Sequence, residues 1–368
     1  MKLYMPTEIY NEKNCVVNHS RDLAALGKNA FIVTGKHSSR INGSLNDVTA
    51  ALEQEGIVYE IFDSVEENPS VDTVMKARDL GIRCNAEFVI GVGGGSPMDA
   101  SKAIALMIAN PEQDADILYA KAGQSIADVR KALPVVCVPT TAGTGSEVTP
   151  YSILTRETAE GQKAKQSIAH RIFPVLALVD ADYLQTASRS TCVNTAVDTL
   201  AHLIESQLNT NTTDYSRFYS ETGLRTWAKI KDSLIRYEIG EEERKLLMHA
   251  CTLGGMAIAH TQTSIPHGLS YTLTSELGIP HGKAAGIFLP GYLKIYDDKD
   301  AVADALSLLG FEDVQAFEEY IRQLLGEVEI SDEMWGKDVE GLLQNPSRLN
   351  NYPFPIDREK LAACRYIS

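Results

Sequence analysis

The sequence predicts an α/β domain with a mostly parallel sheet at residues 1–186, followed by an all-helical domain at residues 187–368. In the first half, short apolar runs alternate with helical patterns, which is typical of a parallel sheet with helices on both faces. After Val179 the strand-like runs almost disappear, and long stretches of helical period replace them. The clearest of these helical stretches cover residues 191–208, 213–229 and 241–260.

The elements of the first half can be assigned in order from apolar runs and helix boundary signals. Ser44 offers an N-cap to an amphipathic helix that Gly56 is expected to end. A second helix is expected over residues 71–80, closed by Gly81, and a third over residues 97–110. The expected strands are residues 31–34, 57–62, 88–90, 135–138 and 175–179.

Composition and charge narrow the classes of partner. A formal net charge of -15 opposes binding to nucleic acid and to anionic membranes, so we expect neither as a partner. No run of 18 apolar residues is present, and the N-terminus lacks the apolar core of a signal peptide. The six cysteines show no CxxC spacing, which indicates neither a zinc ribbon nor a disulfide framework. We therefore expect a reduced, cytoplasmic protein.

A glycine-rich turn at residues 88–99 (FVIGVGGGSPMD) joins an expected strand to an expected helix. Glycines let the backbone approach a bulky anion, Ser96 can cap the helix, and Pro97 suits its first position. Free N–H groups at such a helix start favour a pyrophosphate. The spacing differs from the usual GxGxxG fingerprint, so a tight turn without a ligand stays open as the alternative.

A second polar loop follows the next strand, with the sequence PTTAGTGSEVT at residues 139–149. Five hydroxyl residues and two glycines suit the binding of amides, hydroxyls and phosphates better than they suit a core. In an open parallel sheet, ligands bind beyond the carboxyl ends of the strands, where both loops are expected. Two such loops together favour a bound dinucleotide over a plain turn.

One carboxylate and three imidazoles form a candidate metal site. Asp198 and His202 are spaced i, i+4, so a helix would present both side chains on one face. His267 and His281 each lie in a Pro-His-Gly tripeptide, whose flanking residues favour fixed turns. This donor set suits Fe²⁺ or Zn²⁺. The alternative is that these residues are helix caps and core histidines; the competing histidines are His170, His249 and His260.

With these motifs in place, the chain resembles the iron-containing (group III) alcohol dehydrogenase family. The most specific stretches are GGGSPMDASK at 93–102, PTTAGTGSEVT at 139–149, the Asp198/His202 helix and HGLSYTLTSELGIPHG at 267–282. The resemblance runs through most of the chain and implies the two-domain architecture of dehydroquinate synthase. It also implies an NAD(P)-dependent oxidoreductase that interconverts a small primary alcohol and its aldehyde.

The resemblance implies a role for individual residues. Asp198, His202, His267 and His281 would hold the metal, usually Fe²⁺, with Zn²⁺ as the alternative. Gly94, Gly95 and Ser96 would bind the pyrophosphate, with Asp99 and Lys102 supporting that loop and the cofactor ribose region. The remaining dinucleotide contacts would come from Thr140, Thr141, Thr144, Lys165 and Leu178.

One position departs from the family pattern. Many members have a second histidine four residues after the first Pro-His-Gly ligand, near the nicotinamide, and here that position is Tyr271. A tyrosine can donate a hydrogen bond but is a poor acid–base group near neutral pH. The proton route therefore stays open between Tyr271 with a ribose hydroxyl and water, and another residue such as His260.

The end of the first expected strand bears on cofactor choice. NAD selection usually places a carboxylate there, against the ribose 2′-hydroxyl. Residues 34–40 (TGKHSSR) contain no carboxylate, but they contain hydroxyls and two cations. We therefore expect NADP(H) in preference to NAD(H), with Gly35, Lys36 and Ser39 among the binding residues. The alternative is that Lys36 and Arg40 are ordinary surface residues.

Three other functions stay open at this point. A glycerol-dehydrogenase-like polyol oxidoreductase and a dehydroquinate-synthase-like lyase would keep the fold and change the reaction. A non-enzymatic binding protein would keep the fold without turnover. The resemblance also leads us to expect a homo-oligomer, at least a dimer.

Overall fold

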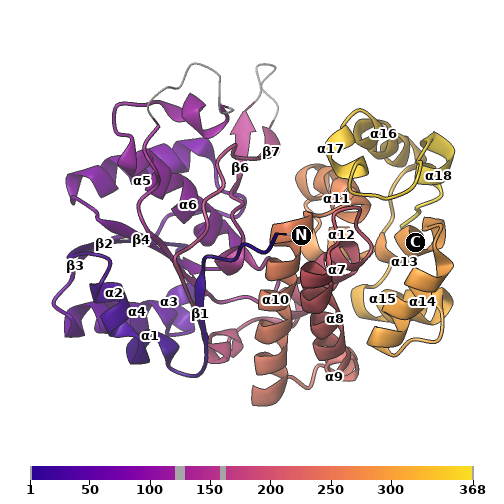
Figure 1. The fold of residues 1–368 in the computed structure, drawn as a ribbon, viewed down its shortest axis with the longest axis horizontal. Helices are drawn as coiled ribbons and strands as arrows, with labels where there is room; N and C mark the ends of the chain where they lie inside the picture. The colour runs from indigo at the N-terminus through magenta and orange to yellow at the C-terminus, as the bar shows by residue number, and fades with distance from the viewer. Residues whose placement is uncertain (1, 121–128, 158–162, 367–368) are drawn as a thin grey trace. The chain divides into compact units, whose positions relative to one another are not determined.

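The computed structural model describes residues 2–120, 129–157 and 163–366. Their contacts group the chain into two compact units (Figure 1). One is an α/β unit containing Met5–Thr141 and Ser146–Ala187. The other contains the residues from Ser188 onward, together with Ala142–Gly145 and the N-terminal residues through Tyr4. The function assigned to each predicted domain stays a prediction.

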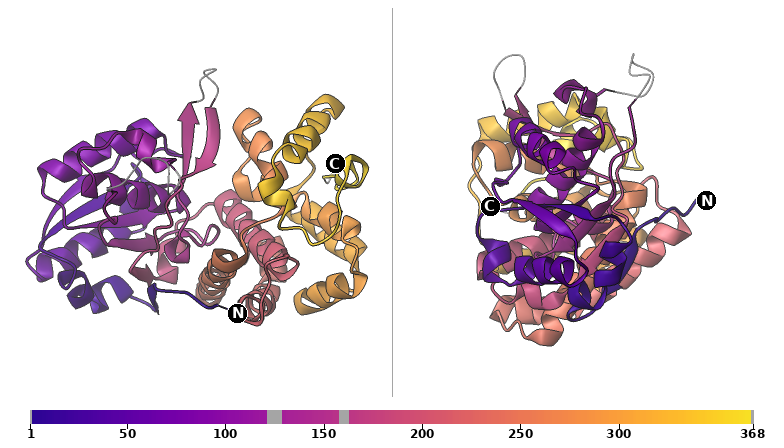
Figure 2. Two further views of the ribbon diagram at one scale, coloured as in Figure 1. Left: turned by 45° about the horizontal axis from the view of Figure 1, so that its top comes forward. Right: turned by 90° about the vertical axis from the view of Figure 1, so that its left-hand side faces the viewer.

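The α/β unit is built on a parallel sheet of six strands, in the order β1-β8-β5-β4-β2-β3. The five expected strands are present, and the fold class predicted from the sequence is confirmed. The edge strand β1 and the antiparallel hairpin of β6 and β7 (Figure 2) were not expected from the sequence. The strands are β1 Glu8–Asn11, β2 Asn29–Thr34, β3 Val58–Phe62, β4 Phe88–Gly93, β5 Val135–Pro139, β6 Ile153–Glu157, β7 Lys163–Ser167 and β8 Leu176–Val179.

Helices cover both faces of this sheet because successive strand residues point to opposite sides. Phe31 and Val33 of β2 pack in the core beneath α5 (Val71–Arg83) and α6 (Gly95–Ala109). Ile32, on the same strand, packs in the opposite core with residues of α1, α2 and α4. The remaining helices of this unit are α1 Cys15–Asn18, α2 Ser20–Ala24, α3 Ser38–Ile41, α4 Ser44–Gln54, η1 Ala115–Leu118, η2 Ser146–Val148 and η3 Ala181–Leu184.

The strand order places a topological switch point between β2 and β4. The chain moves from β2 outward to β3, then crosses back to β4 on the other side of β2 and continues to β5. Ligands of open parallel sheets bind beyond the carboxyl ends of the strands at such a point. Gly35 follows β2 and Gly94 follows β4, so the predicted dinucleotide loops flank the switch point.

Three helix boundaries differ from the sequence prediction. Gly81 lies inside α5 and does not end it, because its missing side chain admits Ile108: a Cβ there would lie 2.3 Å from Ile108 Cδ1. Gly94, not Ser96, is the N-cap of α6. Likewise Gly43 caps α4, and Ser44 is its first residue. In the last two cases a glycine occupies the N-cap position, without a capping hydrogen bond from a side chain.

The second unit is helical, with no strand in its described part. The three longest predicted helices are present as α7, α8 and α10, which pack on one another. In the part of the chain that the structure covers, no helix is both long and apolar enough to span a membrane. The helices are α7 Arg189–Gln207, α8 Asp214–Ala228, α9 Lys231–Arg236, α10 Glu241–Thr261, α11 Ile265–Glu276, α12 His281–Gly286, α13 Leu289–Ile295, α14 Lys299–Leu309, α15 Val314–Leu325, α16 Asp332–Leu343, α17 Pro346–Leu349 and α18 Arg358–Ala362.

Asp338, buried on α16, should make stability depend on pH. Burial raises the pKa of its carboxyl to about 6, above the usual value of about 4 in an unfolded chain. The folded protein therefore binds this proton more tightly, and its stability falls as pH rises from about 4 to about 6. We expect Asp338→Asn to raise the free energy of unfolding at pH 8 by about 2 kcal/mol, with a smaller effect at pH 4.

Urea unfolding at both pH values measures this effect. Asp332→Asn is the matched control, because Asp332 begins the same helix and its side chain is 97% exposed. An equal change in the free energy of unfolding at pH 4 and pH 8 for Asp338→Asn would contradict the raised pKa of Asp338.

Candidate functional site

Helix α7 carries the first part of the candidate metal site. Asp198 and His202 lie one turn apart on this helix, as the sequence spacing predicts, and both are buried. Helix α7 begins at a Ser188 N-cap, whose hydroxyl accepts a hydrogen bond from Thr191 N. Its buried face places the carboxylate and the imidazole side by side, with His202 Nε2 4.0 Å from Asp198 Oδ1.

His267 and His281 both lie at helix starts. His267 is in the first turn of α11, after Pro266, and His281 is the first residue of α12, after a Pro280 N-cap. The Pro-His-Gly tripeptides are thus helix N-termini, where proline is tolerated because the missing N–H has no intrahelical partner. Gly282 serves close packing: a Cβ there would lie 1.8 Å from the backbone oxygen of Asn194 on α7.

The three imidazoles converge on one carboxylate oxygen. Asp198 Oδ1 lies 3.4 Å from His267 Nε2, 3.8 Å from His281 Nε2 and 4.0 Å from His202 Nε2. Ligands held about 2.1 Å from a common metal in tetrahedral geometry are about 3.4 Å apart. Asp198, His267 and His281 each offer one atom within 4.8 Å of the other two, and His202 stacks on His267.

Two buried polar atoms in this cluster fit the binding of a divalent cation. Asp198 Oδ1 and His267 Nε2 have no hydrogen-bond partner among the described residues. Leaving such atoms without a partner in the interior is costly, and a divalent ion would satisfy them together. The residues present therefore fit a metal of the Fe²⁺ or Zn²⁺ type, as the donor types in the sequence suggested.

The charge states of Asp198 and His202 suit a cation, whereas a metal would have to displace a proton from His267. Burial opposes ionisation of Asp198, but the surrounding histidines outweigh it and lower the pKa of the carboxyl below its usual range. Burial lowers the pKa of His202 to about 4, so this imidazole is neutral at pH 7. Burial also opposes protonation of His267, yet Glu205 and Asp198 raise its pKa to about 10.

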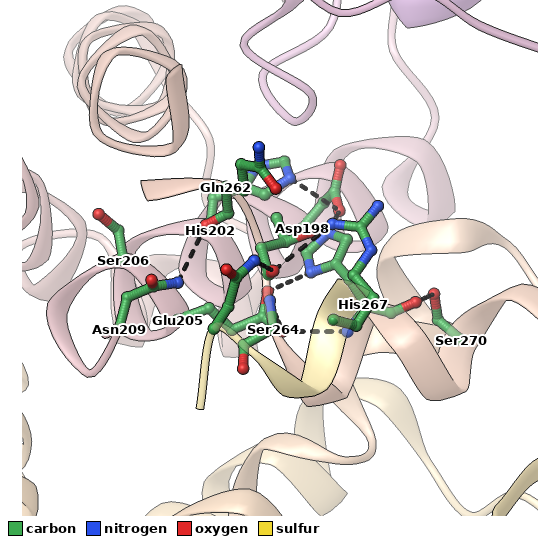
Figure 3. Close-up of polar contacts among 12 residues, drawn as sticks. Asp198, His202, Glu205, Ser206, Asn209, Gln262, Ser264, His267 and Ser270 are labelled. Carbon is green, nitrogen blue, oxygen red and sulfur yellow. Dashed lines mark hydrogen bonds and ion pairs between the residues drawn. The ribbon is translucent and has the colours of Figure 1, made fainter. Parts of the chain in front are cut away.

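Glu205 is a residue of the site that the sequence reasoning missed. It is fully buried on α7, and its Oε2 contacts His267 Nδ1 at short range (Figure 3). His202 Nδ1 is held in a comparable way, 3.2 Å from the backbone oxygen of Gly143. The spacing of Glu205, three residues after His202 on the same helix face, was a signal available in the sequence.

Tyr271 lies beside the side chains proposed as metal ligands. Its ring stacks on His281 with centroids 6.1 Å apart, and its hydroxyl accepts a hydrogen bond of 2.7 Å from Arg348 Nη2. Because a guanidinium only donates, the hydroxyl hydrogen of Tyr271 is available to another acceptor. The competing histidines lie elsewhere: His260 Nδ1 is 2.8 Å from Met256 O, and His170 Nε2 is 2.7 Å from Ile117 O.

In the α/β unit, the two predicted loops meet. A Cβ on Gly94 would lie 3.2 Å from Thr141 Oγ1, and Thr140 N donates to Gly93 O at 2.9 Å. Gly95 begins α6, so the free N–H groups of this helix start face the glycine turn. Ser96 Oγ accepts a hydrogen bond of 3.2 Å from Asn68 N, in the loop after β3.

Asp99 and Lys102 form a buried support beneath this loop. Lys102 is fully buried, and its Nζ donates to Ser146 Oγ at 2.6 Å and to Tyr151 O at 2.8 Å. Asp99 Oδ2 accepts from Ile153 N at 2.9 Å, which ties α6 to β6. Both residues therefore hold the α6 start against the following segment, and their support of a cofactor stays a prediction.

The other predicted cofactor residues have varied surroundings. Ser39 is buried and accepts a hydrogen bond from Thr34 Oγ1, and Leu178 is buried in β8 within a hydrophobic core. Lys165 lies in β7, opposite Thr155, and Thr144 belongs to the segment grouped with the helical unit. Their contacts with a cofactor stay predictions.

Comparison with known proteins adds to this geometry. A family model described as iron-containing alcohol dehydrogenase matches residues 6–181, and the model of the C-terminal part of that family matches residues 192–341. A crystal structure of an iron-containing alcohol dehydrogenase is 37% identical, has a TM-score of 0.89, and covers 99% of this chain and 97% of that chain. The chain belongs to the iron-containing alcohol dehydrogenase family.

Two further relatives agree with this membership. The iron-containing alcohol dehydrogenase of Thermotoga maritima is 37% identical with a TM-score of 0.87, over 99% of this chain and 98% of that chain. An NADPH-dependent butanol dehydrogenase of Clostridium saccharobutylicum is 29% identical over 96% of this chain and 87% of its own length. This iron-containing alcohol dehydrogenase is thus a metal-dependent enzyme, and the family implies iron and NAD(P) as cofactors. Membership of this family favours alcohol dehydrogenase activity over the polyol oxidoreductase and lyase alternatives.

Gly282→Ala should weaken metal binding by this alcohol dehydrogenase. The added Cβ would overlap Asn194 O and lie 3.0 Å from Asp198 Cβ, so α12 must move away from α7 and carry His281 with it. We expect the free energy of unfolding to fall by about 1–3 kcal/mol and the metal dissociation constant to rise. Gly341→Ala is the control, because a Cβ there meets nothing within 4 Å. Unchanged metal affinity in Gly282→Ala would show that this contact does not position His281.

Proposed function

We propose that this alcohol dehydrogenase interconverts a small primary alcohol and its aldehyde with NADP(H), using a metal held by Asp198, His202, His267 and His281. The observation that carries the proposal is the convergence of three imidazole Nε2 atoms within 3.4 to 4.0 Å of Asp198 Oδ1. Fe²⁺ is the expected ion and Zn²⁺ the alternative, since both accept carboxylate and imidazole ligands.

A metal held by these residues would supply Lewis-acid chemistry toward the oxygen of the substrate. The chain's own residues orient the reactants. Asp198 provides a negatively charged ligand, and His202 provides a neutral imidazole fixed by the carbonyl of Gly143. Tyr271, held by Arg348, can donate its hydroxyl hydrogen to an acceptor beside His281.

The preference for NADP(H) rests on charges at the end of β2. Lys36 is exposed directly after Gly35, and no described carboxylate pairs with it. A free ammonium there favours a 2′-phosphate over a 2′-hydroxyl. Arg40 is less available, since its guanidinium lies 2.8 Å from Asp63 Oδ2. A similar protein, the clostridial butanol dehydrogenase, is NADPH-dependent by name.

Metal dependence is tested by stripping the protein with a chelator and restoring Fe²⁺ or Zn²⁺. Aldehyde reduction with a short substrate such as butanal should fall to background and return with one of these ions. Asp198→Ala should lose bound metal and turnover together, because the only carboxylate proposed as a ligand is removed. Full activity in metal-free Asp198→Ala would refute the proposed site.

Cofactor choice is tested by comparing kcat/KM for NADPH and NADH. We expect Lys36→Ala to lower kcat/KM for NADPH about tenfold, or about 1.4 kcal/mol, and to leave the value for NADH nearly unchanged. Lys76→Ala is the control, because Lys76 is an exposed lysine on α5 of the same unit. Equal efficiency with NADH in the wild type would refute the preference.

The substrate range can be measured by varying the aldehyde in the same assay. Self-association of the protein, as at least a dimer, stays a prediction.

A further inference from the structure

Glu205 lies beside the proposed metal ligands without being one of them. It follows His202 by three residues and Asp198 by seven on α7, so all three side chains share one helix face. Its side chain is fully buried, and both of its oxygens have partners within the protein. A buried carboxylate in this position must be accounted for, since burying an uncompensated charge is costly.

One oxygen of Glu205 holds the start of α11. Its Oε1 accepts hydrogen bonds from Ser264 N at 3.2 Å and from His267 N at 3.0 Å (Figure 3). The first N–H groups of a helix have no intrahelical partner, and Ser264, the N-cap, makes no capping bond with its side chain. Glu205 therefore replaces the cap of α11, and a carboxylate is favoured at this positive end of the helix.

The other oxygen of Glu205 contacts the ring of His267. Its Oε2 makes a short contact with His267 Nδ1, and the opposite ring atom, Nε2, faces Asp198 Oδ1 at 3.4 Å. An ionised carboxylate only accepts hydrogen bonds, so Nδ1 must carry a hydrogen to bond with it. The lone pair that can bind a metal is then the one on Nε2, which faces the other proposed ligands.

We propose that Glu205 is a positioning residue that fixes both the backbone and the ring of His267, so that Nε2 is presented to the metal. The inference rests on the proposed metal site. Glu205 does for His267 what Gly143 O does for His202, but with a full negative charge instead of a carbonyl dipole. A charged acceptor makes the imidazole a stronger donor to the metal. The contribution of His267 to metal affinity therefore depends on a partner outside the ligand set.

The test compares Glu205→Gln with wild type by metal affinity, measured as competition with a chelator for Zn²⁺ and Co²⁺. Glutamine keeps one oxygen for the two backbone N–H groups, but its amide nitrogen can only donate toward Nδ1. We expect the metal dissociation constant to rise about 10- to 100-fold and the visible spectrum of bound Co²⁺ to change. The urea midpoint of each metal-free protein measures any structural cost separately.

Ser206→Ala is the matched control. Ser206 is the next residue of α7, is fully buried, and its hydroxyl accepts a hydrogen bond of 3.0 Å from Thr261 Oγ1, away from the imidazole nitrogens and the carboxylate of the proposed site. Its metal affinity and Co²⁺ spectrum should match those of wild type. Equal loss of affinity in both variants, or a Glu205→Gln protein that is less stable but binds metal as wild type does, would overturn the positioning role.

A measurement on the wild type covers the case in which Glu205→Gln does not fold. In the Zn²⁺-loaded protein with ¹⁵N-labelled histidine, His267 should show a strongly downfield Nδ1 proton that exchanges slowly, because the bond to Glu205 is buried. Absence of such a proton would overturn the inference. A wild-type protein that binds no metal would instead overturn the proposed function, and the inference with it.

Discussion

The proposed metal site in the helical unit depends on the buried negative charge of Asp198. Asp198 is ionised in the interior, and the cost of removing a carboxylate from water must be met by the groups around it. Three helix segments supply those groups: α7 carries Asp198 and His202, α11 carries His267, and α12 carries His281. These helices approach one another closely, as at Gly282, and this approach brings the three imidazoles within 4.0 Å of Asp198 Oδ1.

Much of this arrangement could be predicted from local sequence. The i, i+4 spacing of Asp198 and His202 predicts a shared helix face, because the helical period is fixed. The partnership of Glu205 with His267 could not be predicted in this way, since 62 residues separate them and only packing joins α7 to α11. The close packing of Gly282 against α7 could not be predicted either. A glycine that follows a histidine is equally compatible with a turn and with a close contact between helices.

In the α/β unit, the sequence predicted the strands with apolar runs, including the edge strand β3, and missed the polar strands. Strands β2, β4 and β5 are buried and apolar, so their runs were clear, and the loops at their carboxyl ends followed from them. β1 is a short, polar edge strand and carries no such signal. Gly81 was wrongly taken as a helix end because glycine is common both at C-termini and where helices cross closely.

The placement of the proposed metal ligands within one unit has a consequence for how the stability of the protein depends on metal concentration. All four proposed ligands lie between Asp198 and His281, in the helical unit alone. An ion bound only by the native state stabilises it by RT ln(1 + [M]/Kd), so the helical unit gains stability with free metal concentration. The α/β unit contributes none of the proposed ligands. Protein made without metal should therefore be cut by proteases within the helical unit faster than metal-loaded protein is.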